Sequence, residues 1–322
     1  MVPALALATR DVFVEQAAQC EGRSPLYVEL LRKWADDPVA AEIVGPDPDW
    51  DAPLRLAGGL HYLVLGGEAQ WDNPLAKHQE FLARFVAEQG VQTNEVQRSW
   101  VLAPLLLRVA ERTGVSTLDL VELGPSAGLN LVWDRYRYAY EAGEWGPERA
   151  AVRLTGEERG PVPARLLEGE VSVRGRVGID RSPIDVTSEE GARLLRSFVW
   201  AGQTERLERL DRAIDALRAD PPELVRGDFV EELPEVLAAQ PADGLTVVFQ
   251  TAALGYVGDQ GRKRVREALE TAGAERPLAF VSTGKPRVGG EDWGLRLVYW
   301  PTGEREFAGH ADFHGSWLRW EL

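Results

Sequence analysis

The sequence has a single cysteine, Cys20, among its 322 residues. One cysteine cannot form a disulfide within the chain, and it cannot build a site in which several cysteines hold a metal. Disulfide-stapled folds and cysteine-rich metal sites are therefore excluded for one chain. A chain without disulfides fits the reducing cytoplasm, and we expect a cytoplasmic protein.

Long hydrophobic runs are also missing. No apolar stretch reaches the roughly 20 residues that a membrane-spanning helix needs. The start of the chain is mildly apolar but has no basic leader followed by a long apolar core, so we expect no signal peptide there.

Basic residues are in the minority, since 36 Lys and Arg face 51 Asp and Glu, which gives a net charge of −15. A surface of this sign disfavours binding to nucleic acid or to an anionic membrane, because both depend on neutralising phosphate. We therefore expect a small-molecule partner, and the sequence leaves the oligomeric state open.

What is present divides the chain into two parts. Up to residue 115, apolar side chains recur at spacings of three and four, which predicts amphipathic helices. These expected helices cover residues 12–18, 27–34, 54–64, 81–86 and 100–109. Loops rich in Pro, Gly and Asp separate them. We expect residues 1–115 to form a helical cap or substrate domain.

From Thr117 onward, short β-rich runs alternate with helical runs. The expected strands are 118–123, 171–179, 224–226, 245–249, 278–282, 295–300 and 317–322, and the expected helices are 129–140, 189–199, 204–219, 230–239 and 262–272. Such alternation predicts an α/β fold with a parallel sheet and helices on both faces. The last runs predict a closing antiparallel hairpin. We expect residues 116–322 to form this domain, with an insertion at about 141–170.

The most informative stretch runs from Glu122 to Gly128. A strand-like run precedes it and a helix-like run follows, so its glycines predict a tight turn whose backbone N–H groups face a ligand. An acid at the strand end beside such a turn can hold a polar ligand. The alternative for Glu122 is to cap the next helix or to pair with an arginine. The same stretch also spells Gly124-x-Ser126-x-Gly128, the signature of a hydrolase nucleophile elbow.

Four motifs carry a resemblance to known families. They are Gln92-Thr-Asn-Glu95, Val121-Glu-Leu-Gly-Pro-Ser-Ala-Gly-Leu-Asn130, Gly178-Ile-Asp-Arg-Ser-Pro183 and Gln203-Thr-Glu-Arg206. With them, the chain resembles DUF2332, an actinobacterial-type family of unassigned function. Residues 117–322 also resemble the class I S-adenosylmethionine-dependent methyltransferases. That resemblance implies a Rossmann-like sheet, S-adenosylmethionine as the cofactor and methyl transfer to a small-molecule acceptor.

The resemblance also implies roles for single residues. The glycine motif of the methyltransferases corresponds to Glu122, Gly124, Ser126 and Gly128, with a serine in place of the middle glycine. Asp180 corresponds to the acid that ends the second strand and would accept hydrogen bonds from both ribose hydroxyls. The alternative for Asp180 is an ordinary turn in which an Asp side chain bonds the backbone two residues on.

Further cofactor contacts are implied for residues on later strands. Arg181 follows the second acid, and Asp228 and Phe229 would meet the adenine. Gln250 and Thr251 would lie near the transferred methyl group, and they are candidates for catalysis. The alternatives are that Asp228 caps the next helix and that the two residues at 250 and 251 only bond strand-end backbone groups.

His310 and His314 are the remaining catalytic candidates. They flank Asp312, and the spacing i, i+2, i+4 would place all three on one face of a strand. No other cluster of metal-ligating residue types supports them, so we expect no metal. The polar cluster Gln92–Glu95 precedes an apolar helix, and it is either a capping box or a substrate-facing group.

Two further functions stay open. In a serine hydrolase, Ser126 would be the nucleophile, with Asp228 or Asp259 and then His310 or His314 completing the triad. Against this, the chain before the turn looks helical and contains no oxyanion loop. A regulatory protein that binds a nucleotide without turnover is the second alternative. A nicotinamide dehydrogenase is disfavoured, because the turn does not fit G-x-G-x-x-G.

Overall fold

The chain forms two compact units in the computed structural model. The structure describes residues 4–92, 95–284 and 293–322. The first unit comprises residues 1–93 and 184–211, and the second comprises residues 94–183 and 212–322. The last boundary falls within helix α9 (Thr204–Arg218).

The first unit is helical. Its elements are α1 (Ala4–Cys20), α2 (Pro25–Trp34), α3 (Pro38–Val44), α4 (Ala52–Leu65), the 3-10 helix η1 (Leu75–His78), α5 (Gln79–Glu88), α8 (Glu189–Ser197) and the start of α9. Ser24 caps α2 by accepting the Tyr27 N–H, and Asp37 caps α3 by accepting the Val39 N–H. A proline follows each cap at the first helical position, where its missing N–H costs nothing. The apolar faces of α1 to α5 share one core.

A nine-stranded sheet forms the centre of the second unit. Its strands in spatial order are β5 (Glu157–Gly160), β12 (Trp317–Trp320), β11 (Glu304–Ala311), β10 (Trp293–Trp300), β9 (Leu278–Gly284), β8 (Leu245–Thr251), β1 (Thr117–Leu123), β6 (Ser172–Asp180) and β7 (Glu223–Arg226). The five strands from β9 to β7 pair in parallel. β1 and β8 are buried along nearly their whole length, as expected for strands covered on both faces.

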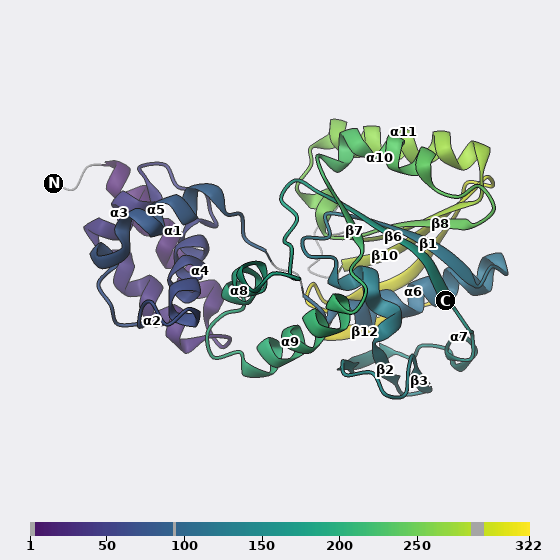
Figure 1. Cartoon of the computed structure of the whole chain (residues 1–322), viewed down its shortest axis with the longest axis horizontal. Coiled ribbons are helices and arrows are strands. Elements are labelled where there is room, and N and C mark those ends of the chain that lie inside the picture. Colours follow the sequence, from purple (N-terminus) through teal and green to yellow (C-terminus); the bar gives the residue numbers. More distant parts are fainter. Residues whose placement is uncertain (1–3, 93–94, 285–292) are drawn as a thin grey trace. The chain divides into compact units, whose positions relative to one another are not determined.

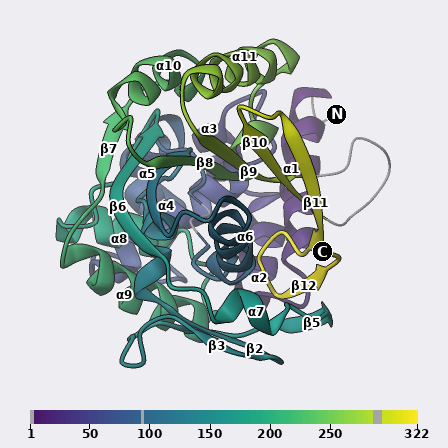
Figure 2. The same cartoon turned by 90° about the vertical axis from the view of Figure 1, so that its right-hand side faces the viewer.

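Helices cover both faces of this sheet (Figures 1 and 2). α10 (Phe229–Ala239) and α11 (Asp259–Glu275) lie side by side on one face, and α6 (Arg98–Thr113) lies on the other. Val121, Val248 and Leu233 are among the residues of the core below α10 and α11. The predicted α/β fold with a large, mostly parallel sheet flanked by helices is therefore confirmed.

The far end of the sheet is mostly antiparallel. β10 pairs antiparallel with both β9 and β11, and β12 returns antiparallel to β11. β5 adds a parallel strand at the edge beside β12. The antiparallel hairpin expected near the end of the chain is thus present as β10 and β11.

The helix expected over residues 129–140 is wrong. Leu129–Arg135 form the 3-10 helix η2, and Arg137–Tyr140 form strand β2. β2 pairs with β3 (Gly143–Trp145) and β4 (Arg153–Leu154) in a separate three-stranded sheet. Tyrosines at positions 136, 138 and 140 alternate along this stretch, and aromatic alternation favours a strand. The region expected as an insertion holds β3, β4, β5 and the short helix α7 (Ala164–Leu167).

Two segments lie in a different unit from the domain in which the sequence analysis placed them. Residues 94–115, which include α6, belong to the second unit, and residues 184–211 belong to the first. Within the first unit, Phe198 packs with Tyr62 and Phe85 in a small apolar cluster. The second segment therefore contributes to the core of the helical unit.

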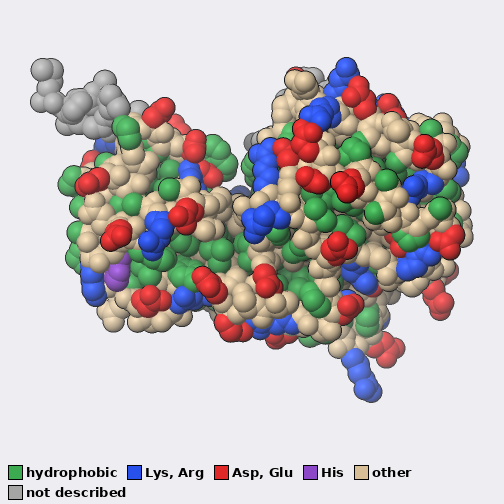
Figure 3. All heavy atoms as spheres, turned by 45° about the horizontal axis from the view of Figure 1, so that its top comes forward, with side chains coloured by type: hydrophobic (Ala, Val, Ile, Leu, Met, Phe, Trp, Pro, Cys, Tyr) green, Lys and Arg blue, Asp and Glu red, His purple; other side chains and the backbone are tan. Residues whose placement is uncertain are grey.

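The face of the molecule drawn in Figure 3 carries charged side chains of both signs. On the face drawn in Figure 3, acidic and basic side chains are interspersed, and no broad basic area gathers there. Over the described ranges of the chain, no helix is both long enough and apolar enough to cross a membrane.

Candidate functional site

The carboxyl ends of the parallel strands hold most of the predicted site residues. The chain builds outward from β1 to β6 and β7 on one side, and then to β8 and β9 on the other, so the strand order reverses between β1 and β8. Ligands of open parallel sheets bind outside the carboxyl ends of the strands at such a point. Glu122 is the next-to-last residue of β1, Asp180 the last of β6 and Gln250 the next-to-last of β8.

The turn after β1 adopts the left-handed conformation three times. Its φ angles are +69° at Gly124, +56° at Ser126 and +83° at Gly128. A Cβ on Gly124 would lie 2.8 Å from the Cβ of Ala253, and one on Gly128 would lie 2.9 Å from Pro222 Cγ. Both glycines are thus required by backbone conformation and by close packing against the protein itself.

Glu122 is a fully buried acid at the end of β1. Its side chain is 1 % exposed, and its Oε2 atom has no hydrogen-bond partner among the described residues. The Asn130 side chain hydrogen-bonds the carboxyl group, and Ser99 Oγ lies 2.7 Å from Asn130 Oδ1. Burial raises the pKa of Glu122 to about 8 and outweighs the opposing effect of the bond from Asn130. The negative charge of Asp180 adds to the increase, and Arg98 opposes it.

Ser126 is buried with an unsatisfied hydroxyl group. It is 7 % exposed, and within the part of the chain that the structure describes its Oγ atom has no hydrogen-bond partner. Its backbone N–H donates to Asp180 Oδ2 at 2.9 Å. The serine–imidazole hydrogen bond that a catalytic triad needs is therefore not among its contacts.

Asp180 joins two turns through its carboxylate. While Oδ2 accepts the Ser126 N–H, Oδ1 accepts the Ser182 N–H at 2.8 Å. The hydrogen bond to Ser182 forms the ordinary turn that was the alternative for Asp180, in which an Asp side chain bonds the backbone two residues on. Because a carboxylate has about four acceptor positions, each oxygen keeps acceptor capacity for a ligand.

Asp228 caps helix α10. Its Oδ1 accepts the Val230 N–H at 2.9 Å, and its Oδ2 accepts a hydrogen bond from Arg181 at 2.6 Å. Although partial burial would raise the pKa of Asp228, the hydrogen bonds from Arg181 and Val230 hold it below its usual value. Phe229 is buried among the core residues below α10 and α11 rather than exposed for stacking on a ring.

Gln250 uses its amide completely. Its NH₂ group donates to Ser282 Oγ at 2.8 Å and to the Thr283 carbonyl at 2.7 Å. Its Oε1 accepts the N–H groups of Ala252 at 2.8 Å and Leu254 at 3.3 Å. These contacts hold the chain after β8 where Ala252 has the unusual φ of +122°. Gln250 therefore stabilises this loop. This agrees with the alternative that its side chain bonds backbone groups at the strand end.

Arg98 connects α6 to the same edge of the sheet. Its guanidinium donates to the carbonyls of Thr251 at 3.0 Å and Phe313 at 2.8 Å, and it lies 4.1 Å from the centre of the Phe313 ring. Thr251, Phe313 and neighbouring residues line a crevice of about 10 Å³, which is room for about one water molecule.

The two histidine candidates do not share a strand face with Asp312, so that prediction is wrong. His310 lies in β11, but the strand ends at Ala311. Asp312 and His314 fall in the following turn, where Asp312 Oδ2 accepts the His314 N–H at 3.0 Å. In the described part of the chain, no group of three or more His, Cys, Asp or Glu side chains is placed to hold a metal ion. Of the cluster at 92–95, Thr93 and Asn94 lie outside the described residues.

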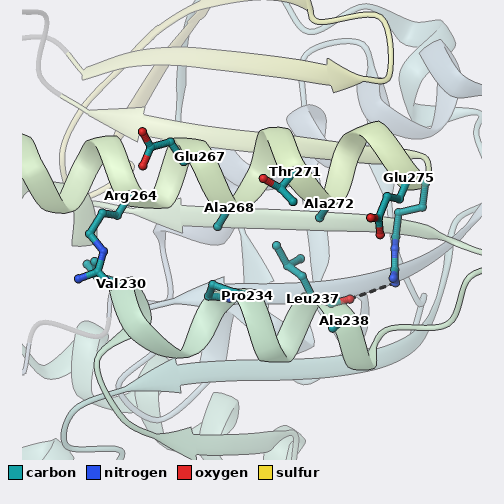
Figure 4. Close-up of a pocket in the computed structure, with 11 residues that line it drawn as sticks. Val230, Pro234, Leu237, Ala238, Arg264, Glu267, Ala268, Thr271, Ala272 and Glu275 are labelled. Carbon is teal, nitrogen blue, oxygen red and sulfur yellow. Dashed lines mark hydrogen bonds between the residues drawn. The ribbon is translucent and has the colours of Figure 1, made fainter.

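A larger groove lies between α10 and α11 (Figure 4). Its volume is about 350 Å³. The side chains along it are Val230, Pro234, Leu237 and Ala238 from α10, Arg264, Glu267, Ala268, Thr271, Ala272 and Glu275 from α11, and Arg276. Arg276 donates to the carbonyls of Leu237 and Gln240. None of the predicted site residues lines this groove.

Sequence reasoning missed the residues behind Glu122. Ser99 and Asn130 are 0 % and 4 % exposed, and Arg98 acts on the same acid through its charge. A signal was present in the lone polar Asn130 within an otherwise apolar run, since a buried polar side chain needs a partner. That signal does not identify the partner.

No curated protein matches the chain. A family described as "Uncharacterized protein conserved in bacteria (DUF2332)" matches residues 10–320, which is nearly the whole length, and the chain therefore belongs to this family.

Proposed function

We propose that the second unit binds S-adenosylmethionine and that the protein transfers a methyl group to a small molecule. The observation that carries this proposal is Glu122, a buried acid placed where the strand order reverses, with one oxygen that no described residue contacts by a hydrogen bond. Numbered along the chain, the five parallel strands have the order 3-2-1-4-5. That order is found in doubly wound nucleotide-binding sheets, which supports the proposal.

Four residues fit the cofactor. Glu122 Oε2 and Ser126 Oγ are buried polar atoms without hydrogen-bond partners in the described ranges, and they suit the amino-acid end of the ligand. The carboxylate of Asp180 is held by one backbone N–H on each oxygen, so it is oriented to accept the two ribose hydroxyls. Asp228 keeps acceptor capacity toward the adenine amino group. Phe229 and Gln250 are left out, because one is in the core and the other has its amide satisfied.

The cofactor supplies a methyl group on a sulfonium, which is already reactive. The residues of this chain would then act by positioning and by excluding water, since alignment of two reactants supplies much of the rate gain in such reactions. The net charge of −15 favours a small-molecule acceptor over nucleic acid.

Calorimetry with S-adenosylmethionine and S-adenosylhomocysteine tests the site. Asp228→Asn is the informative variant, because Asn also caps helices while it removes the carboxylate. We expect its affinity to fall about tenfold, the effect of one lost hydrogen bond.

Asp243→Asn is the matched control, since Asp243 precedes β8 at the opposite edge of the sheet and pairs with Arg174. Its affinity should match that of the wild type. No binding of either compound at millimolar concentration would falsify the cofactor proposal. Binding without turnover on a broad panel of acceptors would favour the regulatory alternative.

A serine hydrolase remains the second candidate, because Ser126 has a positive φ in a turn between a strand and a helix. This is the position of the nucleophile in α/β-hydrolases. A fluorophosphonate probe decides the matter. Labelling of the wild type that is lost in Ser126→Ala supports the hydrolase, and absence of labelling rejects it.

A further inference from the structure

We propose that Glu122 is a neutral, protonated carboxyl group in the free protein and that it releases its proton to solvent when a cationic group of the ligand enters the site. The identity of the ligand rests on the proposed function. The protonation of the free protein does not, and it can be tested alone.

The first argument is the burial of an unpaired acid. Glu122 is 1 % exposed, and its neighbours Val121 and Leu123 along β1 are 0 % exposed. Strands β6 and β8 flank it on either side. No ion pair joins Glu122 within the described chain, and its Oε2 has no partner. Burying an isolated carboxylate is so costly that the group takes up a proton instead.

The second argument is the chain of hydrogen bonds behind it. Ser99 Oγ donates to Asn130 Oδ1 at 2.7 Å, and both residues are buried. An amide whose oxygen is occupied in this way turns its NH₂ group toward Glu122. The NH₂ group then donates a hydrogen bond to the carbonyl oxygen of the acid. The proton of the acid is therefore on Oε2, the oxygen that accepts no hydrogen bond. Ser99 and Asn130 are positioning residues that orient the acid.

The charged groups around Glu122 do not overcome the effect of burial, which favours the protonated acid. From α6, the positive charge of Arg98 favours the carboxylate, but its effect on this acid is smaller than that of burial and that of Asp180. From β6, the negative Asp180 disfavours it. Tyr136, after η2, is buried and donates its hydroxyl to a carbonyl. The resulting pKa of about 8 leaves the acid mostly protonated at neutral pH.

Binding of the cationic group and release of the proton from Glu122 together change a single covalent bond of the protein. The O–H bond of Glu122 breaks, the proton passes to water or buffer, and the carboxylate pairs with the incoming ammonium group of the ligand. No other bond forms or breaks. The affinity for a cationic ligand should therefore rise with pH up to the pKa of Glu122 and then level off.

The first experiment uses the protein without ligand. Glu122→Gln imitates the protonated acid, so it should fold like the wild type. The pKa of Glu122 is near 4.5 in the unfolded chain and about 8 in the folded protein. The contribution of Glu122 to the stability of the wild type therefore falls as the pH rises from 4.5 to 8, and it does not change further above pH 8. We expect its melting temperature to fall relative to Glu122→Gln between pH 5 and 8. Parallel curves over this range overturn the proposal.

The second experiment counts protons by calorimetry with S-adenosylhomocysteine at pH 7, in phosphate and in Tris. We expect the wild type to release roughly 0.9 proton per ligand, given its protonated fraction, and Glu122→Gln to release none. Asp228→Asn should bind more weakly yet release as many protons as the wild type. Binding without this release overturns the coupling and leaves the proposed function standing. If neither compound binds, the proposed function and the coupling fail together, and the melting curves still decide the protonation.

Discussion

Ser126 combines two features that lower the stability of the folded protein. Its φ of +56° lies in the left-handed region, which is unfavourable for residues with a Cβ. Its hydroxyl is also buried without a partner among the described residues, which costs free energy. Strained and unsatisfied groups of this kind cluster at functional sites, which is consistent with the ligand contact that we propose for Ser126.

We expect Ser126→Gly to raise the free energy of unfolding by about 1 kcal/mol, because it removes both the strain and the unsatisfied hydroxyl. Ser126→Ala should be less stabilising, since it keeps the Cβ and its strain. Urea denaturation measures both. A glycine variant less stable than the wild type would show that the hydroxyl has a partner after all.

At the residue scale, part of the candidate site was predictable. Glu122 and Asp180 stand at strand ends beside tight turns, and local pattern finds such positions. Ser99 and Asn130 were not predictable as a pair, because they are 31 residues apart and come from separate elements. For Gln250, the pattern placed the residue correctly but could not show that its amide is already satisfied.

At the scale of elements, local chemistry decides where helices begin. Asp228 stands at the start of α10 with its side chain on the Val230 N–H, and this is the position where Asp is favoured. The stretch 129–140 shows where prediction from the local sequence pattern fails. Its apolar content suited a helix, but pairing with β3 and β4 made part of it a strand.

We expect Asp228→Ala to lower the free energy of unfolding by about 1 kcal/mol through loss of the cap, and Asp228→Asn to change it little. The ion pair with Arg181 adds little, because that arginine is 70 % exposed. Thermal or urea unfolding of both variants measures the difference. Equal losses of unfolding free energy in the two variants would show that the charge of Asp228, and not its hydrogen bond to the helix end, stabilises the protein.

At the scale of the whole molecule, the order of segments along the chain matters. The first unit is built from two stretches separated by 90 residues of the second unit, from 94 to 183. Ala192, Leu195 and Phe198 in the later stretch are buried. Removing residues 1–93 would leave these apolar side chains without the helices that cover them.

A chain of residues 94–322 should therefore aggregate, because those side chains become exposed. We expect a shorter version, with residues 184–211 replaced by a Gly–Ser linker, to stay monomeric and to unfold cooperatively. Size-exclusion chromatography and thermal melts compare the two. Equal behaviour of both would mean that this segment does not depend on the first unit.

The sequence by itself determined the class of fold and most of its elements, because periodicity and capping act between residues close along the chain. It also placed two acids at strand ends. Only the tertiary structure decided the order of the strands, the assignment of α6 and residues 184–211 to their units, and which polar atoms were left without partners. These depend on contacts between distant segments, and no local pattern encodes which distant segment will provide or withhold a hydrogen bond.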